Sequence, residues 1–75
     1  MVVYQIIGNT YICTTIDADT IAKKAEMLLM STIRNKTERE RRAAEILAWC
    51  KKAQPGKFLK QDELFTITVS EKVRR

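Results

Sequence analysis

Apolar side chains follow a two-residue period at both ends of the chain and a helical period between them. The first run, residues 2–7, and the second, residues 10–16, are rich in β-branched and aromatic residues and are separated by Gly8-Asn9. Two such runs joined by two turn-forming residues are typical of a β-hairpin. Glycine suits the first turn position of a type II′ turn, because that position needs a positive φ. The pattern therefore predicts a hairpin over residues 1–16.

A loop at Gly8-Asn9 sets Ile6 opposite Tyr11 and Tyr4 opposite Cys13. The alternation then gives the hairpin two faces, of which the first is the better core. The first face holds Val2, Tyr4, Ile6, Tyr11 and Cys13, and the second holds Val3, Gln5, Ile7, Thr10, Ile12 and Thr14.

The middle of the chain, residues 19–53, predicts a pair of amphipathic helices. Apolar residues recur at helical spacing from Ile21, after the capping candidates Asp17 and Asp19, and predict a helix over about Asp19–Arg34. The pattern lapses near residue 35 and resumes over Thr37–Ala53.

Thr37 and Glu40 have the spacing of a capping box at the start of the second helix, and Pro55 follows its end. The alternative is one unbroken helix, about 50 Å long at 1.5 Å per residue. Such a helix is too long for this chain unless it dimerises.

The last element is a strand over residues 64–70, in which Phe65, Ile67 and Val69 alternate with hydroxyl-bearing residues. Phe58-Leu59 forms either a short extended piece or a plug against the helices, and residues 71–75 are expected to be a polar tail. The order β-β-α-α-β predicts an α+β, two-layer sandwich: one domain over residues 1–75, with a three-stranded antiparallel sheet and the helical pair packed on one face.

The amino-acid composition gives little support for an enzyme. The chain has no histidine, which removes the commonest general base near neutral pH and the commonest metal ligand. Its two cysteines, Cys13 and Cys50, form no CxxC pair and are expected to be reduced thiols, with a redox-linked pair as the alternative. We therefore expect a protein that is not an enzyme and has no metal or cofactor.

The expected location is the cytoplasm. No apolar run approaches the ~20 residues of a membrane helix, and the N-terminus lacks the basic start and cleavage site of a signal peptide. A membrane partner is accordingly not expected.

The second hairpin face is the first candidate for function. Val3, Ile7 and Ile12 make it apolar enough to bind a partner, and it carries no charge that binding would have to desolvate. A homodimer is the simplest way to cover it; alternatively, the helices or the chain tail cover it, or it is threonine-rich surface. Trp49, at the edge of the second helix's apolar stripe, is a further candidate anchor.

The second candidate is a basic region that holds most of the net charge of +5. Seven bases and three acids between residues 37 and 60 leave +4 there; the bases are Arg39, Arg41, Arg42, Lys51, Lys52, Lys57 and Lys60. They could steer an acidic protein partner, or contact a phosphate backbone while Trp49 stacks on a base. The glutamates among them leave open a third possibility, a solvated face of neighbouring ion pairs.

These patterns together favour a small non-catalytic protein–protein interaction module. The chain is short and has neither histidine nor a cofactor-binding motif, and in these features it resembles small regulators or inhibitors encoded by phages and mobile elements. The partner would be acidic, and the anchor would be Val3, Ile7 and Ile12 or the Trp49 edge. The alternative is a nucleic-acid-binding module that uses the basic second helix.

Overall fold

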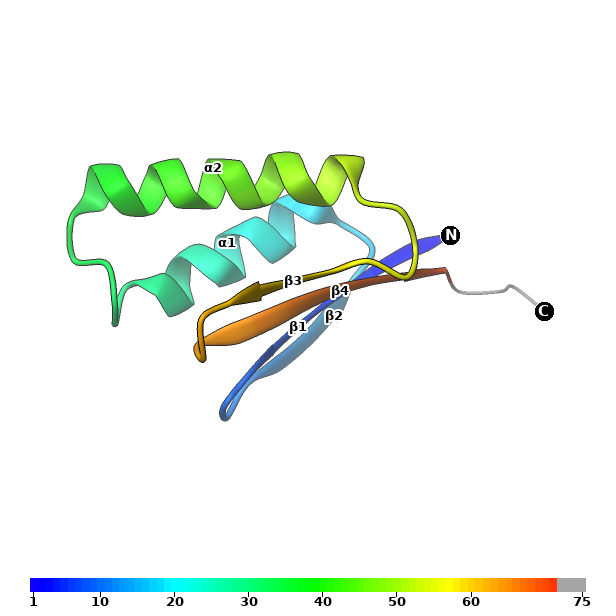
Figure 1. Cartoon of the computed structure of the whole chain (residues 1–75), viewed down its shortest axis with the longest axis horizontal. Helices are drawn as coiled ribbons and strands as arrows, with labels where there is room; N and C mark the ends of the chain where they lie inside the picture. Colours follow the sequence, from blue (N-terminus) through cyan, green and yellow to red (C-terminus); the bar gives the residue numbers. More distant parts are fainter. Residues whose placement is uncertain (72–75) are drawn as a thin grey trace.

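The computed structural model describes residues 1–71 and contains two helices and a four-stranded antiparallel sheet (Figure 1). The sheet order is β2-β1-β4-β3, so the first and last strands form its centre. The elements are β1 (Val2–Gly8), β2 (Ile12–Thr15), α1 (Ala18–Leu29), α2 (Lys36–Lys52), β3 (Phe58–Gln61) and β4 (Phe65–Glu71). The predicted α+β class with two helices and an antiparallel sheet is confirmed. The predicted number of strands, three, is wrong.

The additional strand is β3, which begins at the Phe58-Leu59 pair. The turn before it has Pro55 and Gly56 at its two central positions, and Gly56 adopts a φ of +96° that favours glycine. The Lys57 N–H donates to Gln54 O (3.2 Å), and the Gly56 N–H donates to Val69 O (2.7 Å). The bond to Val69 holds the turn against β4, so that the residues after the turn pair with β4 as strand β3. Of the two alternatives for Phe58-Leu59, a short extended piece or a plug against the helices, the structure shows the first, as the start of a four-residue strand.

The N-terminal hairpin turns one residue later than predicted. Gly8 is still in β1 and its N–H donates to Tyr11 O (2.7 Å), so Asn9 and Thr10 form the turn. Ile6 consequently faces Cys13 rather than Tyr11. The type II′ assignment was also wrong, because Gly8 is not among the described residues with a positive φ. The register shift is two residues, an even number, so the strand residues keep their predicted faces, whereas Thr10 moves from the second face into the turn.

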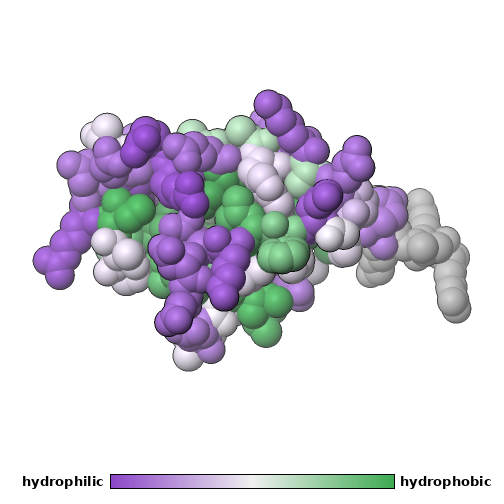
Figure 2. All heavy atoms as spheres, viewed as in Figure 1, coloured by the Kyte–Doolittle hydropathy of each residue, from purple (hydrophilic) through white to green (hydrophobic). Residues whose placement is uncertain are grey.

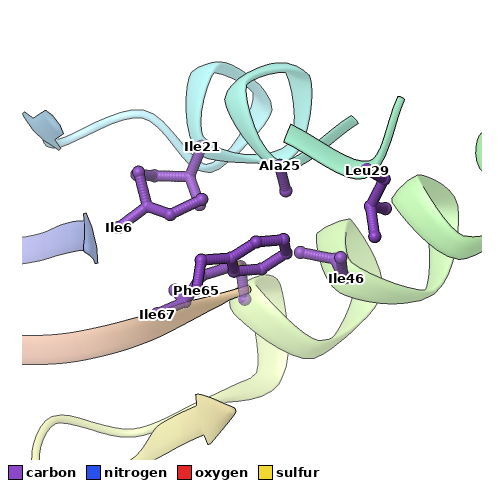
Figure 3. Packing of buried hydrophobic residues seen from close by; sticks show 8 residues of the cluster. Ile6, Ile21, Ala25, Leu29, Ile46, Phe65 and Ile67 are labelled. Carbon is purple, nitrogen blue, oxygen red and sulfur yellow. The ribbon is translucent and has the colours of Figure 1, made fainter. Parts of the chain in front are cut away.

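The core lies between the helices and one face of the central strands (Figure 3). From the sheet it receives Ile6, Phe65 and Ile67, which are at most 3% exposed. From the helices it receives Ile21, Ala25, Leu29, Ile46 and Cys50. Ile6 and Ile67 are register partners on neighbouring strands. Both helices therefore pack on the same side of the strands, as Figure 1 also shows.

The break between the helices differs from the prediction, because the first helix ends earlier and the second begins one residue earlier, at Lys36 rather than Thr37. α1 ends at Leu29 rather than near Arg34, and α2 is capped by Asn35, whose Oδ1 accepts from the Glu38 N–H (3.1 Å). The Thr37 capping box is therefore wrong. Arg39 stabilises the connecting segment, because its guanidinium donates to the carbonyls of Ile33 (3.1 Å) and Arg34 (3.3 Å) there.

Two long-range contacts join distant parts of the chain. The Tyr4 hydroxyl of β1 donates to Cys50 O (3.3 Å), one of the terminal carbonyls of α2 that lack a partner within the helix. The amino group of Met1 pairs with the Glu71 carboxylate (2.6 Å). Glu71 thus belongs to β4 rather than to the predicted tail, and the rest of that tail, residues 72–75, lies outside the described residues.

Within the described residues, neither helix combines the length and the apolar character that a membrane crossing requires.

The two proposed caps of α2 can be separated by mutation. Asn35→Ala is expected to lower the free energy of unfolding by about 0.5–2 kcal/mol, because it leaves a helix N–H without a partner. Thr37→Ala, the matched control two residues away, should change it by no more than about 0.5 kcal/mol. Urea denaturation of both variants measures the difference. Equal losses would mean that Thr37 contributes to the cap.

Candidate functional site

The face of the sheet turned away from the helices carries mostly uncharged side chains. Strand pairing and the alternation of side chains assign ten residues to it, of which one is charged. We call these residues the open face: Val3, Gln5, Ile7, Ile12, Thr14, Phe58, Lys60, Thr66, Thr68 and Ser70. Ile12 and Phe58 are each 67% exposed and Ile7 is 38% exposed. The helices therefore leave this face uncovered.

Two exposed isoleucines, Ile7 and Ile12, lie side by side at one end of the open face, and we call this pair the apolar corner. Ile7 lies directly opposite Ile12 on one side and Thr66 on the other. Since neighbouring strands are about 4.8 Å apart, the two isoleucine side chains lie within contact range. In the next row Gln5 Nε2 donates to Thr14 Oγ1 (3.1 Å), which satisfies two polar groups of the face internally.

The predicted anchor residues do not form one cluster. Val3 is opposite Ser70 in the row beyond Gln5, so it lies about 13 Å along β1 from Ile7. Trp49 is on α2 and packs against the core on the other side of the sheet. Phe58 was not among the predicted surface residues, because its outward direction follows from the pairing of β3 with β4, and the sequence left open whether Phe58-Leu59 is extended or a plug against the helices.

A hollow of about 320 Å³ adjoins the apolar corner at the end of the sheet where the two hairpin loops lie. Its lining includes the open-face residues Ile7, Lys60 and Thr66 and the loop residues Asn9, Asp62 and Glu63. The hollow places a concave surface beside Ile7, and its lining combines apolar groups with the charged side chains of Lys60, Asp62 and Glu63.

The arginines of α2 have partners within the chain. Arg41 pairs with Glu38 (2.6 Å) and with Glu45 (3.8 Å). Arg42 pairs with Glu45 (3.0 Å) and also donates from Nε to Gln61 Oε1 of β3 (2.8 Å). All three ion pairs have the three- or four-residue spacing of neighbours on a helix. With Arg39 holding the helix connection, none of the three arginines is available without loss of an internal contact.

The remaining basic charge gathers where α2 meets β3. Residues 46–61 contain four lysines and no acid. Within this segment, Lys52 and Lys57 line a second hollow of about 340 Å³ together with Trp49, Ala53 and Gln54. No ion pair among the described residues involves either lysine. Figure 2 shows hydrophilic side chains along α2 and hydrophobic side chains exposed among the strands. The basic region of the sequence thus divides into a paired half and an unpaired half.

The two cysteines are the remaining candidates for reactive side chains. Burial raises the pKa of the Cys50 thiol to about 11, so this sulfur stays protonated near neutral pH and is a poor nucleophile. Cys13 is half-buried, and both cysteines are free thiols. Among residues 1–71, no group of three or more histidine, cysteine or acidic side chains is placed to hold a metal ion.

Comparisons of the chain with protein-family models, with curated proteins and with solved structures found no match.

Two neighbouring isoleucines test the assignment of the faces. Ile6→Lys puts an unpaired ammonium into the core, and the penalty of several kcal/mol rivals the total stability of about 4–11 kcal/mol expected for this length. We expect this variant to be unfolded. Ile7→Lys, one residue further along β1, is expected to fold and to lose no more than about 1 kcal/mol. Circular dichroism with urea titration measures both. An unfolded Ile7→Lys variant would contradict an open face.

Proposed function

We propose that this chain is a non-catalytic two-layer α+β module that binds another protein through its open face. The observation that carries the proposal is the segregation of charge: nine of the ten open-face side chains are uncharged, although the chain carries a net charge of +5. Such a surface can be buried without stripping water from many charges, which is the property expected of the centre of a protein interface.

The apolar corner is the proposed anchor. Ile7, Ile12 and the adjoining hollow combine exposed aliphatic surface with concavity, and Phe58 adds an exposed aromatic ring across the sheet. Binding energy is commonly concentrated in a few apolar or aromatic side chains surrounded by near-neutral contacts. The threonines of the open face, together with Gln5 and Ser70, provide these near-neutral surrounding contacts.

Lysines, rather than the arginines of α2, provide the positive charge that attracts the proposed partner. Arg39, Arg41 and Arg42 have partners within the chain, whereas Lys51, Lys52 and Lys57 make no ion pair in the described part of the chain. An exposed cluster of one sign raises the association rate with a partner of the opposite sign. The proposed partner is therefore an acidic protein, and the module acts on it as a regulator or inhibitor.

The double variant Ile7→Lys/Ile12→Lys tests the proposal. Two lysines in place of the apolar corner are expected to weaken partner binding by at least about 100-fold, because two ammonium groups would then have to be desolvated at the interface centre. The partner is first identified by a photo-crosslinking residue at position 12 and then purified. Binding is measured by calorimetry.

Ala44→Lys/Ala48→Lys on the exposed side of α2 is the matched control, since it adds the same charge away from the open face. The control should bind within about twofold of the original chain. Full binding by the open-face variant would exclude the proposed site.

Light scattering after size-exclusion chromatography, with and without a short DNA duplex, separates the remaining classes. A dimer that the Ile7→Lys/Ile12→Lys variant dissociates would identify the partner as a second copy of the chain. Binding of the duplex that is lost steeply with salt would favour the basic helix and a nucleic acid instead.

A further inference from the structure

The outer edge of β3 presents backbone groups without partners. The Val69 N–H donates to Lys57 O (3.0 Å), which fixes the phase of the β3–β4 ladder. Because hydrogen-bonding direction alternates along an antiparallel strand, the backbone groups of Leu59 and Gln61 turn toward β4 and those of Phe58 and Lys60 turn outward. The turn and loop hydrogen bonds of the described residues give these outward groups no partner.

Lysines flank this edge on both faces of the sheet. Lys60 lies on the open face beside Phe58. Lys57 lies on the helix side, where it lines the hollow of Trp49 and Lys52. Edge-strand lysines discourage pairing of identical strands, because two copies would bring their ammonium groups together. The same charges favour a strand that carries carboxylates.

The other edge of the sheet lacks these features. β2 offers the outward backbone groups of Ile12 and Thr14, and none of its four residues is charged. An added strand there would have no electrostatic preference. β3 is therefore the edge that can select its partner.

We infer that β3 receives an extended acidic segment of a partner protein as a fifth strand. Its backbone would pair with Phe58 and Lys60, its carboxylates would enter the hollow between Lys52 and Lys57 beside Trp49, and its apolar side chains would lie along Phe58. A peptide backbone fits this edge better than a nucleic acid, since the edge offers carbonyl acceptors as well as N–H donors and phosphates cannot donate to them. This site goes beyond the proposed open-face function and does not depend on it.

Trp49 is the single tryptophan of the chain, so its fluorescence reports on the hollow. The probe is a capped ten-residue peptide of alternating glutamate and valine, which places all carboxylates on one face of a strand. We expect saturable fluorescence change with this peptide and none with the matching lysine–valine peptide. Absence of saturable binding by the glutamate–valine peptide would overturn the inference.

Two matched pairs of variants test the hollow and the backbone separately. Lys52→Glu should weaken binding of the peptide by about tenfold or more, whereas Lys51→Glu, the same change on the adjacent residue outside the hollow, should weaken it by about threefold or less. Lys60→Pro removes an outward N–H that Lys60→Gln retains, so the proline variant should bind about tenfold more weakly than the glutamine variant. Circular dichroism checks that all four variants fold.

Other outcomes identify other occupants. Equal losses for Lys51→Glu and Lys52→Glu, or for Lys60→Pro and Lys60→Gln, would show a diffuse charge effect and exclude strand addition. Binding of an oligothymidylate in preference to the peptide would assign the hollow to nucleic acid. Self-association that Lys60→Pro abolishes would assign the edge to a second copy. The Ile7→Lys/Ile12→Lys variant should still bind the peptide, so failure of the open-face proposal is distinguishable from failure of this one.

Discussion

The pairing of β1 with β4 is the contact on which the rest of the structure depends. These strands come from opposite ends of the chain and pair along their full seven-residue lengths, from Val2 opposite Glu71 to Gly8 opposite Phe65. The register sets Ile6 beside Ile67, and both are fully buried under the helices. Because side chains alternate, this one alignment also directs Val3, Gln5 and Ile7 to the opposite face. The core and the open face are therefore two consequences of the same register.

The spacing of hydrophobic residues in the sequence predicted the two helices and the antiparallel sheet. The division of the N-terminal hairpin into a core face and a second face survived an error in its turn, since the error was an even number of residues. The sequence predicted the pairing of β1 with β2 in the hairpin, but it did not predict the long-range pairings. The pairing of β1 with β4 and the short strand β3 depend on contacts between distant residues, and the side chains of Phe58 and Lys60 have a direction only once β3 is in place. This is why Phe58 was missed as an exposed residue.

For the basic residues too, the sequence predicted local contacts but not contacts between separate elements. Arg41 and Arg42 have local partners whose helical spacing is visible in the sequence, so their partial neutralisation was predictable. Arg39 and the bond from Arg42 to Gln61 were not, because they bridge separate elements. A count of charge along the chain treats arginine and lysine alike, yet Arg39 and Arg42 donate to groups of other segments, whereas Lys52 and Lys57 make no ion pair in the described part of the chain. The planar, multidentate guanidinium suits the first role, and the hydrated ammonium suits the second.

The two proposed surfaces meet at β3. This strand carries Phe58 on the open face and lies between that face and the hollow of Trp49. Its stability depends on the Pro55-Gly56 turn, which is itself bonded to β4 through Val69. A partner that covers the open face and also pairs with the edge of β3 would use apolar burial for affinity and charge for selection. The lysines that allow an acidic strand to approach would repel a second copy of the chain. Specificity of this kind needs both an attraction and a repulsion, and a strand of four residues supplies both because its charge lies beside its free backbone groups.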